Sequence, residues 1–130
     1  MVIVDTSVWI DFFKGIDNKK TQMLSSLEAQ KMDIYTTGLI ISEILGSVKN
    51  NVIFRELESK LLNLQAVNPI YPSTYINAAI IYGDGRKQGI IIRKMIDCLI
   101  AQLAIENSLY LLHKDEDFDK IATFTSLKIF

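Results

Sequence analysis

Cysteine and histidine are almost absent from this sequence, since each occurs once, as Cys98 and His113, in a chain of 130 residues. A disulfide within the chain is therefore excluded, and so is a zinc site built from several thiolate and imidazole ligands. No apolar run reaches the length of a membrane span, and no basic segment precedes the apolar start of the chain. We expect a soluble, cytoplasmic protein.

Several common catalytic and binding motifs are also missing. The chain has no Gly-x-Ser-x-Gly nucleophile elbow, no Gly-x-x-x-x-Gly-Lys phosphate loop and no Gly-x-Gly-x-x-Gly after a predicted strand. The formal net charge is −1, which argues against a generic polycation that coats nucleic acid. Any chemistry must therefore come from a different set of side chains.

What the chain does contain is an alternation of strand-like and helix-like segments. The predicted strands are Val2–Asp5, Asp33–Thr36, Ala66–Pro69, Leu109–His113 and Leu127–Phe130. The predicted helices are about Ser7–Lys14, Lys19–Gln30, Gly38–Val48, Val52–Asn63, Ser73–Lys87 and Lys94–Asn107. This order predicts an α/β fold: a single domain over residues 1–130, with a central parallel sheet of about five strands covered by helices on both faces.

Four carboxylates stand in or beside apolar runs, where an acid is locally unfavourable: Asp5, Glu43, Asp97 and Asp115. Removing an ionised carboxylate from water needs a compensating partner. Asp5 ends the first predicted strand and Asp115 follows the fourth, so a parallel sheet places both at its carboxyl edge, where ligands bind. The simplest solution is that the four acids converge and share a divalent cation. Oxygen ligands alone select Mg²⁺ or Mn²⁺.

Three of these acids also have a structural interpretation. Asp5 is a good N-cap for the helix that follows it. Glu43 falls at the boundary of the apolar sector of its helix and can be a solvated residue or an acid at the edge of a cleft. Asp97 can pair with Arg93 one helical turn earlier.

The functional interpretation is strongest for Asp97. On a helical wheel Asp97 shares its sector with Ala101 and Ala104, whose small side chains leave space beside it. Gln102 lies on the opposite side of the same helix, where we expect solvent. A surface acid would be found near Gln102, and Asp97 is not there.

The run from Asp115 to Asp119 is acidic enough to form a solvated turn, anchored in the core by Phe118. Only one or two of its acids can face a site. Asp115 is the first candidate because it directly follows a predicted strand, and Asp117 is the second. The single histidine, His113, is interpreted as a structural residue and not as a general base.

Positive charge is concentrated just ahead of Asp97. No acid occurs between Gly85 and Ile96, and this stretch holds Arg86, Lys87, Arg93 and Lys94. A solvated basic loop is one interpretation. If the acids form a site for a phosphodiester, we expect Arg86 and Arg93 to contact phosphate, with the neighbouring lysines adding weaker attraction.

Four short motifs together resemble the PIN-domain proteins. Residues Val2–Ile10 (VIVDTSVWI) are similar to the first PIN motif and Ile41–Ile44 (ISEI) to the second. Residues Ile96–Ala101 (IDCLIA) and His113–Phe118 (HKDEDF) resemble the third and the fourth. Their order and spacing are most similar to the VapC-type toxins of bacterial and archaeal toxin–antitoxin pairs.

The resemblance implies a Mg²⁺- or Mn²⁺-dependent endoribonuclease. It implies the catalytic acids Asp5, Glu43, Asp97 and Asp115. It implies metal ligands among Asp5, Asp97, Asp115 and Asp117, with Thr6 and Ser7 positioning metal or phosphate. The implied partners are an RNA substrate, a cognate antitoxin protein and a second copy of the chain in a homodimer.

Three other functions are compatible with parts of the pattern. One is a non-catalytic module that binds RNA or a partner protein, and another is a PIN-domain ribonuclease of RNA processing. A third is an aspartyl-phosphate enzyme or receiver. The dehalogenase type of that class needs Asp-x-Asp, whereas position 7 here is serine. Metal-dependent cleavage of RNA distinguishes the nuclease from the non-catalytic module and from the aspartyl-phosphate protein.

Overall fold

Five short strands form one sheet in the order β3-β2-β1-β4-β5 in the computed structural model, which describes residues 1–130. The strands are β1 (Val2–Val4), β2 (Ile34–Thr36), β3 (Gln65–Ala66), β4 (Tyr110–Leu112) and β5 (Lys128–Ile129). All four neighbouring pairs are parallel. The predicted parallel sheet of five strands is confirmed, and β3 begins one residue earlier than expected and is shorter.

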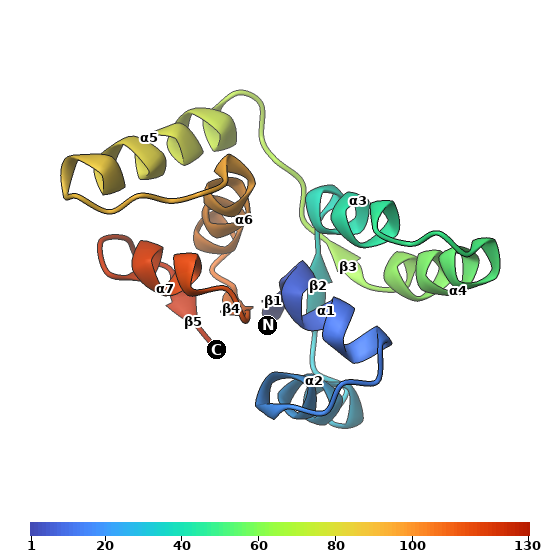
Figure 1. Cartoon of the computed structure of the whole chain (residues 1–130). Helices are drawn as coiled ribbons and strands as arrows, with labels where there is room; N and C mark the ends of the chain where they lie inside the picture. The colour runs from blue at the N-terminus through green and yellow to red at the C-terminus, as the bar shows by residue number, and fades with distance from the viewer.

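Seven helices cover the sheet. They are α1 (Thr6–Phe13), α2 (Lys19–Ala29), α3 (Gly38–Gly46), α4 (Asn51–Leu62), α5 (Ser73–Lys87), α6 (Met95–Glu106) and α7 (Glu116–Ala122). Figure 1 shows α1–α4 on one side of the strands and α5–α7 on the other. Right-handed crossovers explain this, because the chain moves outward from β1 to β3 and then returns past β1 to β4 and β5. The predicted α/β class is confirmed.

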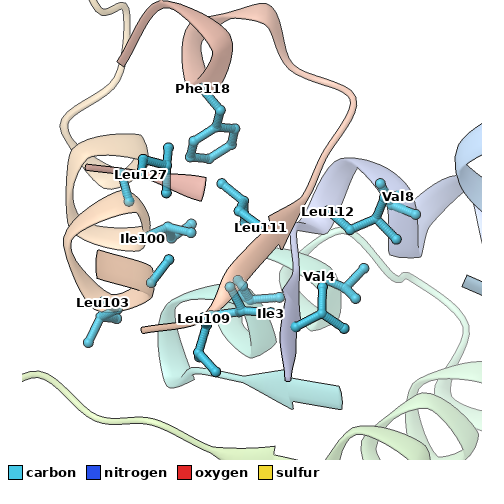
Figure 2. Packing of buried hydrophobic residues seen from close by; sticks show 14 of the residues in the cluster. Ile3, Val4, Val8, Ile100, Leu103, Leu109, Leu111, Leu112, Phe118 and Leu127 are labelled. Atoms are coloured by element: carbon cyan, nitrogen blue, oxygen red, sulfur yellow. The ribbon is translucent and has the colours of Figure 1, made fainter. Parts of the chain in front are cut away.

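The core lies on both faces of the two central strands. Figure 2 shows Ile3 and Leu111 directed toward α6, and Val4 and Leu112 directed toward α1, as the alternation of side chains along a strand requires. None of these four side chains is exposed. Strands buried on both faces read as continuous apolar runs, which is why β1 and β4 could be recognised in the sequence. None of the seven helices combines the length and the apolar character that crossing a membrane requires.

Helix α7 replaces the acidic turn that the sequence predicted after β4. Asp115 is its N-cap and accepts a hydrogen bond from the backbone N–H of Asp117. Acids in the first turn of a helix interact favourably with its positive end, which stabilises this acidic segment as a helix. Phe118 is fully buried, so its predicted role as an anchor is confirmed.

The predicted exposure of Gln102 is wrong. Its side chain is buried and donates to Glu106, and Glu106 in turn accepts a hydrogen bond of 2.8 Å from Thr74 on α5. Helix α5 therefore packs over the face of α6 that a helical wheel assigns to solvent. The Arg93–Asp97 pair does not form either, because α6 begins at Met95 and the Arg93 side chain turns to other acids.

Candidate active site

An acidic pocket of about 270 Å³ opens at the carboxyl edge of β1 and β4. Its wall is formed by Asp5, Thr6, Ser7, Ile10, Glu43, Lys94, Asp97 and Asp115. The structure thus brings together the four acids that the sequence singled out. They arrive from the end of β1, the middle of α3, the first turn of α6 and the loop that follows β4.

Asp5 caps α1 and also lines the acidic pocket. Its backbone is extended as the N-cap of α1, and its Oδ2 accepts hydrogen bonds from the Ser7 backbone at 3.0 Å and from Ser7 Oγ at 2.6 Å. Ser7 Oγ also accepts from the backbone N–H of Lys114 at 3.1 Å. One serine therefore connects the Asp5 carboxylate to the loop after β4.

Glu43 is oriented by a threonine from the opposite wall. Thr6 Oγ1 donates to Glu43 Oε1 at 2.9 Å, which holds the carboxylate at the edge of the acidic pocket. Burial raises the pKa of Glu43, the hydrogen bond from Thr6 lowers it, and the negative charge of Asp5 raises it again. The net direction is upward, so this carboxylate retains a proton more readily than an exposed glutamate.

Asp97 is the least compensated acid of the pocket. Its side chain is 3% exposed, and its Oδ2 has no hydrogen-bond partner. Burial raises its pKa to about 7, Lys94 opposes the rise, and the charges of Asp115 and Asp5 add to it. A buried carboxylate oxygen without a donor, in a pocket lined by other acids, is the arrangement that a cation would satisfy.

Asp115 and Asp117 differ although they are two residues apart. Asp115 lines the acidic pocket, and its Oδ1 accepts from Arg93 Nη2 at 2.8 Å. Asp117 is fully buried outside the pocket wall and accepts from the Arg93 backbone and Nε, both at 3.1 Å, and from Lys120. Burial works against ionisation of Asp117, but these hydrogen bonds lower its pKa overall. The structure therefore places Asp115, and not Asp117, at the pocket.

Arg86 is not brought to the acidic pocket. Its guanidinium lies 5.5 Å from the centre of the Tyr82 ring, and it lines a separate hollow with Ile90, Ile91 and Ile92. Lys94, which the sequence ranked below the arginines, is the basic residue in the pocket wall. The signal in the sequence that could have identified Lys94 was its position three residues before Asp97.

Sequence reasoning missed the ion pair between Asp11 and Lys114. Lys114 Nζ donates to Asp11 Oδ2, which also accepts from Asn18 at 2.9 Å. The hydrogen bond from Lys114 lowers the pKa of Asp11, although burial opposes it. This contact fixes the loop after β4 against α1, beside Ser7. The only signal in the sequence was an acid inside the apolar run Trp9–Phe13.

His113 lies outside the pocket wall, as expected for a structural residue. It is buried, and its Nε2 lies 3.2 Å from Asp119 Oδ1. Burial lowers its pKa, although the negative charge of Asp119 opposes the shift. No three side chains of histidine, cysteine, aspartate or glutamate form a cluster ready to hold a metal ion. The acidic pocket is thus an open lining of carboxylates, with the oxygen donors that Mg²⁺ and Mn²⁺ prefer.

A parallel α/β sheet whose carboxyl edge gathers these acids defines a domain of the PIN type. The model of the PIN-domain family matches residues 2–123. The chain belongs to the PIN-domain family, as its four motifs predicted.

The most informative relatives match over the full length of the chain. A VapC ribonuclease of Mycobacterium bovis and ribonuclease VapC11 of Mycobacterium tuberculosis are each 33% identical over 131 residues, which cover 98% of this chain and 96% of theirs. The predicted similarity to VapC proteins is confirmed.

Solved structures share the fold at lower identity. FitAcB from Neisseria gonorrhoeae matches with a TM-score of 0.80 and 22% identity, covering 100% of this chain and 96% of that one. VapBC2 from Rickettsia felis, bound to a promoter DNA fragment, matches with a TM-score of 0.76 and 16% identity, covering 100% and 98%. These likenesses support the architecture described above.

Proposed function

We propose that this protein is an endoribonuclease that hydrolyses RNA phosphodiester bonds with the help of Mg²⁺ or Mn²⁺ and acts as the toxin of a toxin–antitoxin pair. The observation that carries the proposal is the unpartnered, buried carboxylate oxygen of Asp97 in a pocket lined by three further acids. The full-length similarity to VapC ribonucleases supports the reaction and its substrate class.

The oxygen donors of the pocket suit a hard divalent cation in their chemistry, although the carboxylates stand as an open lining and not as a closed coordination cluster. Asp5, Asp97 and Asp115 would hold the ion, because all three line the pocket and offer only oxygen. Carboxylates that line one pocket repel each other when ionised, and a bound cation removes that repulsion. When bound, the ion supplies a water of lowered pKa and polarises the phosphate group.

The remaining residues of the pocket wall orient the acids or accept a proton. Ser7 fixes Asp5, and Thr6 fixes Glu43 through Oε1, so we assign both hydroxyls positioning roles and not contact with RNA. Glu43 Oε2 stays free of protein hydrogen bonds and can accept the proton of an attacking water. Arg93 pairs with both Asp115 and the buried Asp117, which fixes the position of Asp115.

The same proposal includes protein partners. Related folds were solved as toxin–antitoxin assemblies, one of them from Klebsiella pneumoniae, so we propose a cognate antitoxin as the partner. We also propose a homodimer, because Tyr75, Ile76 and Ile80 leave a partly apolar surface on α5, each about half exposed. The cytoplasm, where RNA is available, is the proposed site of action.

The test is RNA cleavage by the purified protein with Mg²⁺ or Mn²⁺ and with EDTA. We expect cleavage only with the metal, and a loss of about 100-fold or more in Asp97→Asn, since a metal ion contributes several kcal/mol to such a transition state. Glu116→Gln is the matched control, because Glu116 is an acid of the same region with a side chain 75% exposed. Undiminished cleavage by Asp97→Asn, or cleavage that continues in EDTA, would contradict the proposal.

A further inference from the structure

An acidic pocket repels the polyanion that it is proposed to cleave, so a basic group must meet the phosphate near it. The sequence offered Arg86, Arg93 and the lysines beside them. Arg86 is excluded by its position over Tyr82, in a different hollow. Of the four basic residues, Arg93 and Lys94 are the two that form ion pairs with an acid of the pocket, so the choice is between them.

Arg93 is already committed to protein carboxylates. Its Nη2 donates to Asp115 at 2.8 Å, and its Nε and backbone N–H donate to Asp117 at 3.1 Å. Asp117 has no exposed surface, so moving Arg93 onto a phosphate would leave a buried carboxylate with fewer partners. Arg93 is a structural counter-charge in this arrangement.

Lys94 is about as exposed as Arg93 but has no hydrogen bond to a protein carboxylate. It is the basic residue of the pocket wall, its side chain is 54% exposed, and its Nζ lies 3.9 Å from Asp115 Oδ2, beyond hydrogen-bond distance. Its ammonium group donates to no protein acceptor. It immediately precedes α6, whose first turn carries Asp97, and both residues line the acidic pocket.

We propose that Lys94 contacts a non-bridging oxygen of the RNA phosphate group that enters the acidic pocket. This inference rests on the proposed ribonuclease function and assigns the substrate contact of that site. Without RNA, the Lys94 ammonium group lies near the Asp115 carboxylate and reduces the negative charge of the pocket. Removing this positive charge therefore weakens the binding of an anion. It does not weaken the binding of a cation, which the same charge repels.

These opposite effects separate a phosphate contact from a merely structural role. The variants are Lys94→Gln, Lys94→Arg and the control Lys31→Gln, an exposed lysine in the turn before β2, at the amino edge of the sheet. Mn²⁺ affinity is measured by calorimetry, and cleavage kinetics give KM and kcat. Binding of an RNA oligonucleotide is measured by fluorescence anisotropy in the Asp97→Asn background, where RNA stays intact.

We expect Lys94→Gln to lower RNA affinity and raise KM by about five- to tenfold, and to reduce the salt dependence of binding by about one counterion. Its Mn²⁺ affinity stays equal to that of the wild type or increases. Lys94→Arg restores RNA binding, and Lys31→Gln behaves as the wild type.

Unchanged RNA affinity in Lys94→Gln, or a parallel loss of Mn²⁺ affinity, would overturn the assignment. Absence of RNA cleavage by the wild type would instead overturn the proposed function. The anisotropy measurement does not depend on cleavage, so the two failures are distinguishable.

Discussion

Asp97 is an acid whose place in the fold opposes its ionisation. Its carboxylate is buried with one oxygen unpartnered, and burial raises its pKa from 3.8 to about 7. Because the folded-state pKa lies above the unfolded one, the folded chain binds this proton more tightly. The resulting stabilisation is full below pH 3.8 and is lost as the pH rises through about 7.

Replacing this acid with its neutral isostere should therefore stabilise the metal-free protein. We expect Asp97→Asn to raise the free energy of unfolding at pH 8 by up to about 4 kcal/mol, at about 1.4 kcal/mol for each unit of pKa. The gain should shrink at pH 5, where the folded wild type already carries the proton. Urea denaturation in EDTA at both pH values measures it. A less stable variant at pH 8 would contradict the explanation.

The acids of the pocket were predictable from the sequence to different degrees. Asp5 and Asp97 interrupt apolar runs, so the cost of burying these acids can be inferred from the neighbouring residues in the sequence. Glu43 depended on the family resemblance, because its partner Thr6 is 37 residues away. The preference for Asp115 over Asp117 depended on Arg93, another distant residue, and no local pattern contains such information.

Helix α7 shows how a distant contact can decide a local structure. Its first turn contains three acids, a composition typical of a solvated turn. Two features support the helix: the Asp115 cap and the burial of Phe118. A third is the hydrogen bond that the backbone N–H of Arg93, 24 residues earlier, donates to Asp117. The other six helices were recognisable because their apolar periodicity is local.

Removing the buried Asp117 carboxylate should destabilise α7 and the loop before α6. We expect Asp117→Ala to lower the free energy of unfolding at pH 7 by about 2 kcal/mol, since it removes the buried acceptor of hydrogen bonds from Arg93 and Lys120. Glu116→Ala, in the same turn but exposed, should change it by about 0.5 kcal/mol or less. Chemical denaturation of both variants tests the contrast, and equal losses would contradict it.

The pH dependence of this contact has the opposite sign to that of Asp97. Burial opposes ionisation of Asp117, but the bonds from Arg93 and Lys120 lower its pKa overall. The contact therefore stabilises the fold above the ordinary carboxyl pKa near 4 and is lost as the pH falls through the lowered value. The Asp117→Ala deficit should accordingly diminish in strong acid.

The fold as a whole was predictable because topology follows from the order of elements. Alternating strands and helices predicted the parallel sheet, and the sheet predicted which edge carries the site. The packing of α5 on α6 could not be predicted, because both helices have apolar residues on more than one side. That packing buries Gln102 and leaves Arg86 away from the acidic pocket.

A divalent ion that binds only the folded chain should stabilise the entire molecule. At 100 times its dissociation constant, Mn²⁺ should add about 2.7 kcal/mol to the free energy of unfolding. The rise in Tm should be larger at pH 8 than at pH 6, because protons compete with the ion for Asp97.

Differential scanning calorimetry with Mn²⁺ or EDTA measures this effect. Asp97→Asn should lose most of the Mn²⁺-dependent rise in Tm, whereas Glu116→Gln should keep it. Equal rises in the wild type and in Asp97→Asn would contradict a metal site that includes Asp97.

The hydrogen bond from Lys114 to Ser7 joins positions 107 residues apart in the sequence. β1, the central strand, leaves the ribosome well before its partner β4 and the loop that carries Asp115. A nascent chain that stops before residue 114 has Asp5 and Glu43 but lacks one wall of the acidic pocket. For a proposed toxin that cuts RNA, the order of synthesis thus delays assembly of the site until β4 and the loop after it have been synthesised.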